Sequence, residues 1–554
     1  MSTQKTWWKE AVVYQIYPRS FKDSNGDGIG DLRGIISKLD YIESLGINVV
    51  WLNPVFSSPN DDNGYDISDY RNIMSEFGTM ADFDVLLQGL HQRGIKLIMD
   101  LVVNHCSDEH VWFQESRKSR DNPYRDYFHW VPAENGKPNA RWSFFDPDGD
   151  AWKYDETTDA YYLHYFSQKQ PDLKWENPKV RQEIYDMMHF WFKKGIDGFR
   201  MDVITFISKD LSYPPLPESD KPWDYLYANG PKMHEYLQEM NREVLRHYDI
   251  MTVAEGPGTT TENVLDLVSE ERHELNMSYH FEHSSVGYGP RKTIVGDHQD
   301  LVAFKKIHSQ WDAVFKEKGW GTIYLGNHDH PRMVSRWTND SPRWRSLASK
   351  MLTTWLLSMR GTPYLYQGDE LGMTNIKFDR IEDYHDIETI NWYHLTKAEG
   401  GDVQQFLASH KITGRDNGRT PIQWDDTPNA GFTTGTPWLK VNDNYSEINV
   451  AQQEENPDSV LNYFRKMVRL KKENEVLIYG QYQDIAPEHP QIYAFTRTLK
   501  QTTWLVVLNF SDQGVSFHLP DDLGSKSVVI NNYDGYDLND QVLEVKAFQG
   551  LVFG

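Results

Sequence analysis

The sequence is poor in cysteine and in positive charge, and each shortage excludes a class of protein. Cys106 is the one cysteine among 554 residues, so no internal disulfide can form, which suits a reducing compartment. Lys and Arg number 57 against 81 Asp and Glu, a formal net charge of −24. That balance argues against nucleic acid or an anionic membrane as partner, because both attract basic surfaces. An uncharged substrate fits better.

Apolar targeting and anchoring segments are also missing. The opening stretch MSTQKTWWKEAVVYQ has no apolar signal core, and no run of about 18 apolar residues offers a membrane span. With 39% hydrophobic and 14% aromatic residues the chain is nevertheless globular, and its length exceeds one ordinary core. We expect a cytoplasmic soluble protein, a monomer or weak dimer, without nucleic-acid or membrane partners.

An EF-hand is excluded as well, although DSNGDGIGD (23–31) looks like the first half of one. The EF-hand pattern needs a bidentate Glu at loop position 12, and counting from Asp23 that position is Gly34. The preceding VVYQIYP is rich in β-branched and aromatic residues, which indicates a strand rather than a helix. The stretch is therefore either a metal loop of another kind or a solvated Asp/Gly turn.

Apolar runs of strand length recur along the chain, and most are continuously hydrophobic, as in strands buried on both faces of a parallel sheet. They span 12–18, 47–54, 95–105, 198–204, 250–256, 277–282, 321–329 and 361–370. Segments with helical spacing lie between them, the first over 31–46. Eight strands alternating with helices predict an α/β fold, a closed (β/α)8 TIM barrel rather than an open sheet. No G-x-G-x-x-G follows a strand, which weakens a nucleotide-binding alternative.

Two segments do not belong to that alternation. After the third strand about 70 residues pass before a helix begins near Pro178, whereas ordinary loops rarely exceed about 12–15 residues. Beyond about residue 480, short strands follow one another without long helices. We predict an inserted subdomain after strand 3, over 106–172, and a C-terminal antiparallel β-sandwich domain over 480–554. The catalytic barrel then comprises 1–105 and 173–479.

Polar residues cluster at the C-terminal ends of the predicted strands: Asp100, His105, Arg200, Asp202, Glu255, His328 and Asp329. A strand interior disfavours unpaired charge, and in barrels this edge carries the chemistry. Carboxylates from three strands, without a thiol or serine motif, indicate glycoside hydrolysis by a nucleophile and a general acid that later acts as base. Arg200 shares a strand face with Asp202 and can keep it ionised. Glu255 has no adjacent cation in the sequence, which suits a protonated acid.

These residues carry a resemblance to a known family. DLVVNH (100–105), GFRMDVI (198–204), TVAEG (252–256) and NHD (327–329) resemble the four ordered signature regions of the α-amylase superfamily, glycoside hydrolase family 13. Three further stretches resemble its oligo-1,6-glucosidase, dextran glucosidase and α-glucosidase branch: NDDNGYDISDY (60–70), QPDLKWENP (170–178) and GRDNGRTP (414–421). The likeness covers nearly the whole chain.

The resemblance implies a role for each matching residue. Asp202 resembles the nucleophile, Glu255 the acid/base and Asp329 the carboxylate that stabilises the transition state. The implied substrate-binding residues are His105, Arg200 and His328 around the glucosyl ring, Asp62, Tyr65 and Arg415 at the floor of a closed pocket, Phe166 in an aromatic wall, and Val203 beside the second sugar. The 23–31 loop resembles a structural Ca²⁺ site formed by Asp23, Asn25, Asp27, Asp31 and the carbonyl of Ile29.

We therefore expect a retaining, exo-acting α-glucosidase that releases glucose from the non-reducing ends of short α-glucosides. In the resembling branch, Val at position 203 accompanies a preference for α-1,6 linkages, as in isomaltose and isomaltooligosaccharides. An α-1,4-preferring α-glucosidase and a transglucosylase or sucrose isomerase of the same family stay open, although residues 283–320 lack the isomerases' RLDRD-like stretch.

Two more distant alternatives fit less well. LGNHD also resembles part of a metallophosphoesterase motif, but that motif also needs an upstream D-x-H at a strand end and a later G-H-x-H, and neither is suitably placed. A non-enzymatic, transporter-associated heavy chain of this superfamily would need a membrane anchor and usually lacks the catalytic carboxylates. Neither condition fits this sequence, so we do not favour this alternative.

Overall fold

The computed structural model describes residues 5–146, 149–215, 227–316, 318–520 and 527–554. The chain divides into two compact units. The first comprises Met1–Val50, Phe281–Asp379 and Gln405–Gly554, and the second Trp51–His280 and Arg380–Gln404. Residues 147–148 of the expected inserted subdomain and 521–526 of the expected C-terminal domain lie outside the described residues.

Eight strands form one sheet, and each lies within one of the predicted apolar runs. They are β1 (Val13–Ile16), β2 (Val49–Leu52), β5 (Lys96–Val102), β9 (Gly198–Asp202), β10 (Met251–Ala254), β11 (Met277–Ser278), β12 (Thr322–Ile323) and β13 (Thr362–Tyr366). In the first unit β1 and β12 both pair with β13, and in the second the order is β5, β9, β10, β11, all parallel. β2 carries the chain from one unit into the other. Nearly every strand residue is buried, as the continuous hydrophobic runs predict.

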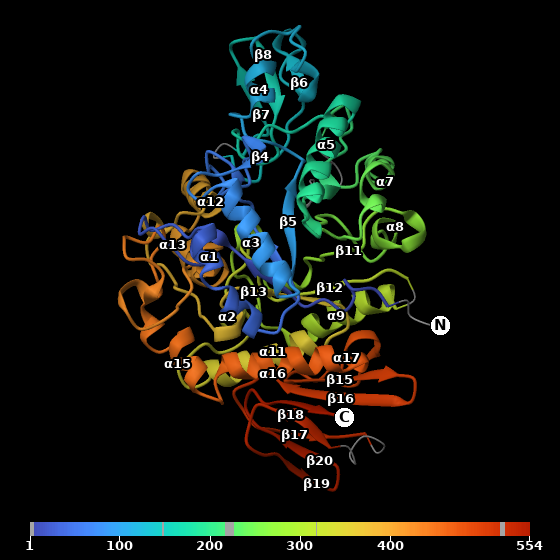
Figure 1. Cartoon of the computed structure of the whole chain (residues 1–554), viewed down its shortest axis with the longest axis vertical. Coiled ribbons are helices and arrows are strands. Elements are labelled where there is room, and N and C mark those ends of the chain that lie inside the picture. The colour runs from blue at the N-terminus through green and yellow to red at the C-terminus, as the bar shows by residue number, and fades with distance from the viewer. Residues whose placement is uncertain (1–4, 147–148, 216–226, 317, 521–526) are drawn as a thin grey trace. The chain divides into compact units, whose positions relative to one another are not determined.

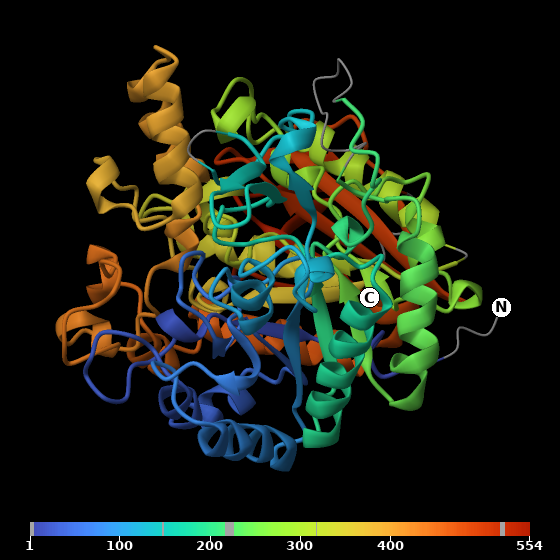
Figure 2. The ribbon, with the colours of Figure 1, turned by 90° about the horizontal axis from the view of Figure 1, so that it is seen from above.

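Six α-helices lie among the described residues of the second unit. They are α3 (Met80–Gln92), α4 (Val111–Ser116), α5 (Pro178–Lys194), α7 (Met233–Glu243), α8 (Val264–Val268) and α12 (Ile387–Ala398). α5 begins at a proline after Asn177, whose side chain caps the first turn, and ends at Gly195 in a left-handed conformation. α5 and α7 lie side by side (Figures 1 and 2), joined by an ion pair of 3.0 Å from Arg181 Nε to Glu239 Oε2.

The first unit contains a break that periodicity does not predict. The apolar spacing over 31–46 suggests one helix, but α1 (Leu32–Ile36) and α2 (Leu39–Ser44) are separate. Ser37 Oγ donates to the carbonyl of Gly34 at 2.6 Å, which gives that acceptor a side-chain partner in place of a helical N–H. The prediction of helical spacing was right, whereas the helix is interrupted at Lys38, whose φ of −113° and ψ of 13° are not helical.

The remaining helices of the first unit are α9 (Leu301–Phe315), α10 (Met333–Trp337), α11 (Arg345–Ser358), α14 (Asp416–Arg419), α15 (Val450–Glu455), α16 (Val460–Glu473) and α17 (Glu475–Tyr479). α13 (Val403–Thr413) spans a boundary between the two units. No helix among the described residues has the length and apolar character needed to cross a bilayer.

The long connection after β5 contains a small antiparallel sheet of its own. Its strands lie in the order β6 (Trp130–Pro132), β8 (Ala160–Leu163), β7 (Trp152–Asp155). A second hairpin, β3 (Phe56–Ser57) with β4 (Asp69–Ile73), follows β2. A buried ion pair ties the connection to the loop after β9, because Lys209 Nζ lies 2.9 Å from Asp172 Oδ2 and donates to Asn104 Oδ1 at 2.6 Å.

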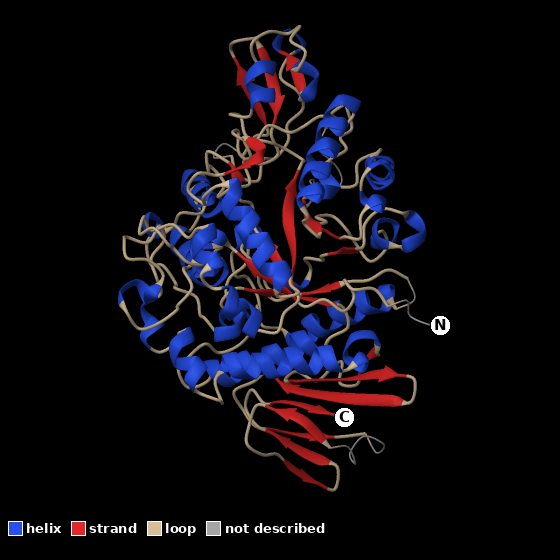
Figure 3. Ribbon diagram, in the orientation of Figure 1, coloured by secondary structure: helices blue, strands red, loops and turns tan. Residues whose placement is uncertain are grey.

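The last part of the chain forms two antiparallel sheets (Figures 1 and 3). One contains β14 (Gln481–Asp484), β15 (Ile492–Leu499), β16 (Thr502–Asn509), β21 (Gly550–Phe553) and β18 (Val528–Asn531), and the other β17 (Val515–His518), β20 (Val542–Val545) and β19 (Asp537–Asn539). Ile492, Leu505, Leu543 and Leu551 belong to the apolar core of this region. The domain boundaries at 105/106, 172/173 and 479/480 stay predictions.

Candidate active site

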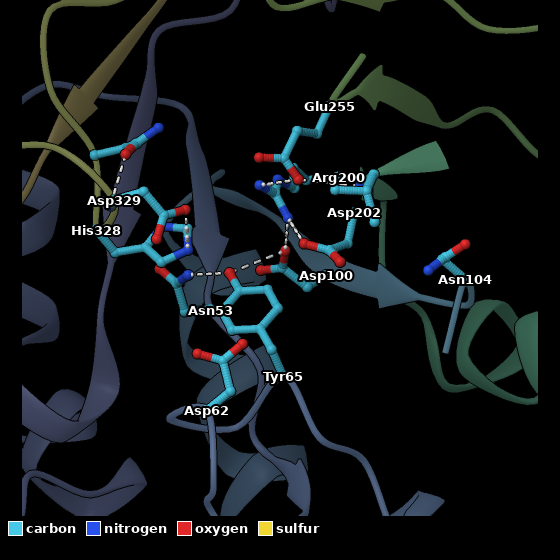
Figure 4. A network of polar contacts seen from close by, with 12 residues as sticks. Asn53, Asp62, Tyr65, Asp100, Asn104, Arg200, Asp202, Glu255, His328 and Asp329 are labelled. Carbon is cyan, nitrogen blue, oxygen red and sulfur yellow. Dashed lines mark hydrogen bonds and ion pairs between the residues drawn. The ribbon is translucent and has the colours of Figure 1, made fainter. Parts of the chain in front are cut away.

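One buried arginine in the second unit contacts three carboxylates (Figure 4). Arg200 Nη1 lies 2.9 Å from Asp100 Oδ1 and 2.5 Å from Asp202 Oδ1, and Nη2 lies 2.8 Å from Glu255 Oε2. Asp100 is held further by Trp51 Nε1 at 2.7 Å. The planar guanidinium can satisfy several carboxylates at once because its donors point outward in a fixed fork.

Strand register explains why these residues meet. Arg200 on β9 stands opposite Asp100 on β5 and Val253 on β10. Arg200 and Asp202 are two residues apart, so their side chains leave the same face of β9. Glu255 directly follows β10, and its N–H donates to the carbonyl of Met201 at 2.9 Å, which extends the ladder by one residue.

The charges of this cluster do not balance. One guanidinium faces three carboxyl groups, so full ionisation would leave two uncompensated negative charges in a buried site. Burial raises the pKa of Asp202 well above its usual value, and the Arg200 charge opposes that rise. Burial likewise raises the pKa of Asp100 to about 7 against the same opposing charge. The cluster titrates as a unit and retains a proton near neutral pH.

The sequence-based interpretation of Arg200 was therefore too narrow. It paired Arg200 with Asp202 and left Glu255 without a cation, because only neighbours in the sequence were visible. The structure gives the same guanidinium to both carboxyl groups. Glu255 Oε1 and Asp202 Oδ2 accept no hydrogen bond within the part of the chain that the structure describes. With 13% and 9% of their side chains exposed, both carboxyl groups keep an accessible edge.

Val203, directly after β9, has a strained backbone. Its φ of 33° and ψ of 41° lie in the left-handed region, which β-branched residues rarely adopt and which costs about 1–3 kcal/mol. This conformation points its N–H at Glu255 Oε2, with a hydrogen bond of 3.0 Å. Its side chain packs in an apolar cluster with Tyr165 and Phe206. Val203 thus both fills a core and orients the Glu255 carboxylate.

The loop between β3 and β4 brings Asp62 and Tyr65 together with His105. Gln170 Nε2 donates to Asp62 Oδ2 at 3.1 Å and lies 3.3 Å from the Tyr65 carbonyl, which is 3.1 Å from His105 Nε2. Tyr65 Oη donates to Asp100 Oδ1 at 3.3 Å and so reaches the arginine cluster. Burial lowers the pKa of His105 to about 3, so its ring is neutral.

Phe166 forms part of a row of aromatic rings. Its ring lies 4.9 Å from that of His105 and is stacked on Phe144 at 5.2 Å. Phe144 continues the row to Phe206 and Tyr227. The carbonyl of Phe144 also accepts a hydrogen bond of 3.2 Å from Trp392 Nε1 of α12. A ring in such a row can present an apolar face to a sugar.

The first unit holds the third predicted carboxylate, Asp329. Arg415 Nη1 and Arg419 Nη2 lie 2.9 Å and 3.1 Å from its Oδ1, and His328 Nε2 lies 3.1 Å from its Oδ2. His328 is buried and its Nδ1 lies 2.8 Å from Gln15 Nε2. Sequence reasoning missed Arg419 and Gln15. The second arginine of GRDNGR was a signal for the former, and a glutamine inside an apolar strand for the latter.

The 23–31 loop is held by its own side chains. Asp23 Oδ1 accepts the N–H groups of Asn25 and Gly26 at 2.8 Å, and Asp27 Oδ1 accepts that of Ile29 at 2.8 Å. Asp31 caps α1 through the N–H of Gly34 at 2.7 Å. Burial raises the pKa of Asp23, but hydrogen bonds from Thr433 and three backbone N–H groups outweigh it and lower the pKa overall. Among the described residues no three His, Cys, Asp or Glu side chains meet as a metal cluster.

Comparison with known proteins matches both regions of the chain. The model of the alpha amylase catalytic domain matches residues 15–480, and that of the maltogenic amylase C-terminal domain matches 482–549. An oligo-1,6-glucosidase of Parageobacillus thermoglucosidasius is 55% identical over 96% of this chain and 95% of its own, and one of Bacillus cereus is 52% identical over 99% of each. A solved trehalulose synthase of Pseudomonas mesoacidophila MX-45 superposes with a TM-score of 0.96 at 44% identity, covering 100% of both chains. The predicted barrel with a C-terminal β-domain is confirmed.

The raised pKa of Asp100 predicts a pH dependence of stability. An unfolded Asp titrates near pH 3.9, whereas the folded value is about 7, so the folded state holds the proton more tightly. The stabilisation is present below about pH 4 and is lost as pH rises towards 7. In chemical denaturation, Asp100→Asn should flatten the fall of the unfolding free energy over that window, whereas Asp121→Asn, at an exposed position, should not. Parallel curves for Asp100→Asn and the wild type would contradict the assignment.

Proposed function

The chain belongs to the α-amylase family of glycoside hydrolases, and from that premise we propose a retaining, exo-acting α-glucosidase that releases glucose from the non-reducing ends of short α-glucosides. The observation that carries this proposal is the shared guanidinium, which holds Asp202 and Glu255 at the ends of neighbouring strands with one oxygen of each unengaged. A double displacement needs two such carboxyl groups, about 5–5.5 Å apart.

The linkage preference rests on the relatives. The four full-length relatives with identities of 52–55% carry the name oligo-1,6-glucosidase. We assign the same preference, for isomaltose and isomaltooligosaccharides, to this chain. Val203 offers a physical reason, since a branched side chain after the nucleophile crowds a directly linked pyranose more than a flexible 1,6 bridge. A methyl-scale difference of this kind is worth about 1–3 kcal/mol.

Asp202 and Glu255 have different roles in the first chemical step. Asp202 Oδ2 attacks the anomeric carbon and forms a glucosyl ester while the glycosidic bond breaks. Glu255 gives its proton to the departing oxygen through Oε1, because Oε2 is occupied by Arg200 and by the N–H of Val203. In the second step Glu255 takes a proton from a water molecule, whose oxygen attacks the anomeric carbon. The ester bond to Asp202 breaks, and glucose leaves with the α configuration.

Asp329 is assigned to stabilising the positive charge of the transition state. Two arginines on Oδ1 and a histidine on Oδ2 keep it ionised and fixed in orientation, as preorganised electrostatic stabilisation requires. His105, His328 and Arg200 are assigned to the glucosyl ring, and Phe166 to an apolar wall. Asp62, Tyr65 and Arg415 are assigned to the closed end of the pocket, which makes the enzyme exo-acting. A pairing of Asp62 with Arg415 stays a prediction.

Sucrose isomerisation is the second candidate, and the solved structures favour it. Trehalulose and isomaltulose synthases resemble this chain at 44–46% identity and TM-scores of 0.95–0.96. The same glucosyl ester would pass to fructose instead of water. Hydrolysis leads because the more similar relatives are hydrolases by name and residues 283–320 lack the isomerases' RLDRD-like stretch.

We propose that the 23–31 loop binds a structural Ca²⁺. The donor set fits, because Asp23, Asn25, Asp27, Asp31 and the Ile29 carbonyl all offer the oxygen ligands that this hard cation prefers. The ion would brace the loop that leads from β1 into α1 and would take no part in the reaction. A cytoplasmic location, consistent with the single buried Cys106, and a monomer or weak dimer are proposed as well.

The function is tested by following sugar products with proton NMR. On isomaltose, α-glucose should appear first and mutarotate later, and isomaltose should give a higher kcat/KM than maltose. Val203→Ala should move that ratio towards maltose by about 10–200-fold. Sucrose should give glucose and fructose. A first product of β-glucose would exclude retention, and isomaltulose or trehalulose from sucrose would instead establish the isomerase.

The two carboxyl roles predict different defects. Asp202→Ala should lose activity on every substrate by several orders of magnitude, because no ester can form. Glu255→Gln should be comparably impaired on isomaltose but partly active on aryl glucosides whose leaving groups need no proton. Glu274→Gln alters another buried, hydrogen-bonded glutamate of the same unit and should keep wild-type turnover. Equal residual activity of the two active-site variants on all substrates would remove the distinction between their roles.

Calcium should stabilise the protein without changing its rate. A ligand that binds only the folded state raises stability by about 2.7 kcal/mol at one hundred times its Kd. Chelation should therefore lower the Tm by a few degrees, leave initial rates at 25 °C unchanged and be reversed by Ca²⁺. Asp23→Asn keeps the hydrogen-bond acceptor but weakens the ligand, so its Tm should respond less to Ca²⁺. Identical melting curves in Ca²⁺ and in chelator would show that the loop is a plain turn.

A further inference from the structure

β1 contains a buried carboxamide that needs an explanation. Gln15 is 1% exposed, and an unpaired amide at such a depth is costly. Alternation along the strand sends Tyr14 to the opposite face, where its hydroxyl binds Glu370 at 2.7 Å. Gln15 and Tyr17 share the other face, and both reach His328. Gln15 Nε2 lies 2.8 Å from its Nδ1, and the Tyr17 ring is stacked with it at 6.1 Å.

Backbone contacts with β13 and with Gln367 hold the main chain of Gln15 in place. It pairs with Tyr366 in the β1–β13 ladder, and its carbonyl accepts the N–H of Gln367 at 3.1 Å. The Gln367 side chain in turn accepts the N–H of Tyr17 at 2.8 Å. The ends of β1 and β13 are therefore locked together, and the Gln15 amide meets the imidazole from a rigid element.

The chain of contacts continues to the catalytic carboxylate. His328 Nε2, on the far side of the ring, lies 3.1 Å from Asp329 Oδ2. An amide NH₂ only donates, so the ring nitrogen that faces it must carry a lone pair. A neutral imidazole with a lone pair on Nδ1 carries its proton on Nε2. That proton then points at Asp329.

We propose that Gln15 is a positioning residue that holds His328 as the neutral Nε2–H tautomer and so supplies Oδ2 of Asp329 with an N–H donor. The proposal rests on the proposed function for its catalytic consequence but not for its geometry. Gln15 acts through His328 and touches neither Asp329 nor, in this proposal, the sugar.

The competing arrangement turns the amide over. Gln15 Oε1 would then accept from Nδ1–H, and contact with Asp329 would require a proton on Nε2 as well, which makes the ring an imidazolium. Within this unit Asp329 already faces two guanidinium groups, those of Arg415 and Arg419. A third positive charge on a ring that is 1% exposed would stand against one carboxylate. The charge balance therefore favours the neutral ring.

The tautomer matters because Asp329 is assigned to a charge that exists only in the transition state. Arg415 and Arg419 contact Oδ1, whereas His328 Nε2 contacts Oδ2 and so helps to fix the rotation of the carboxylate. Loss of the fixed tautomer lets the ring turn a lone pair towards a negative oxygen. An interaction made only in the transition state appears in kcat rather than in KM.

The first readout is the protonation of the ring itself. In protein labelled with ¹⁵N-histidine, long-range proton–nitrogen correlation distinguishes a protonated from an unprotonated ring nitrogen, and His328→Gln identifies the signal by its loss. The wild type should show unprotonated Nδ1 and protonated Nε2 between pH 6 and 8. Gln15→Met should give a mixture of tautomers, and Gln15→Glu, which can only accept, should give the doubly protonated ring. A doubly protonated ring in the wild type would overturn the proposal.

The second readout is kinetic and has a matched control. Gln15→Met keeps the length of the side chain and removes the donor, so kcat on isomaltose should fall about 10- to 100-fold with little change in KM, as expected for one hydrogen bond in a charged chain of contacts. Gln423→Met removes the donor bonds of another fully buried glutamine, to Ile448 and Asn444, and should lower the Tm comparably while leaving kcat unchanged.

The outcomes separate this proposal from the proposed function. An inactive wild type that still shows the Nε2–H ring would refute the glucosidase and leave the tautomer assignment intact. An active wild type whose kcat is the same as that of Gln15→Met would refute the positioning role and leave the glucosidase intact. A fall in kcat of equal size in Gln423→Met would show that general destabilisation explains both.

Discussion

The chemistry of the second unit depends on a single guanidinium that is shared by three carboxyl groups. Arg200 is fully buried, and it binds Asp100, Asp202 and Glu255 at 2.5–2.9 Å. Because one positive charge cannot offset three negative ones in a buried site, the cluster favours holding a proton, and the proposed reaction needs one to protonate the leaving oxygen. The surrounding structure serves this arrangement. Strand register brings the three acids to the arginine, Trp51 and Tyr65 hold Asp100, and the strained backbone of Val203 points an N–H at Glu255.

In the first unit the balance of charges around the carboxylate is the opposite. Within this unit Asp329 faces Arg415 and Arg419 on one oxygen and the His328 ring nitrogen Nε2 on the other. Positive neighbours favour the ionised form of an acid, which suits the charge-stabilising role that we propose for Asp329. The two environments thus separate proton transfer from electrostatic stabilisation, although the same residue types, Asp and Arg, build both. The ratio of arginine to carboxylate decides the role.

The sequence predicted the strands well, because they leave a local signal. Continuous apolar runs mark strands buried on both faces, and all eight strands lie within the predicted runs. Contacts between elements leave no such signal. The Arg200–Glu255 contact depends on the register of β9 against β10, and the Gln15–His328 contact joins residues 313 positions apart. The break between α1 and α2 was missed for a different reason, because the backbone of Lys38 leaves the helical conformation (φ −113°, ψ 13°) while the apolar spacing continues past it. Site residues could therefore be named from the sequence, whereas their partners could not.

In the proposed mechanism, sharing one guanidinium between nucleophile and acid also keeps the negative charge that this pair presents to Arg200 constant through the reaction. In that mechanism the Arg200 charge keeps Asp202 ionised before the first step, against the burial that raises its pKa, and Glu255 carries the proton. In the glucosyl ester Asp202 is neutral, and Glu255, having given its proton to the leaving sugar, is the anion. Arg200 faces one negative charge from this pair at both stages, on Nη1 first and on Nη2 afterwards. The charge moves between two oxygens that already bind the same planar cation, so little reorganisation of the buried site is needed. An arginine dedicated to Asp202 alone would instead lose its counterion when the ester forms, and would oppose the step that it prepares.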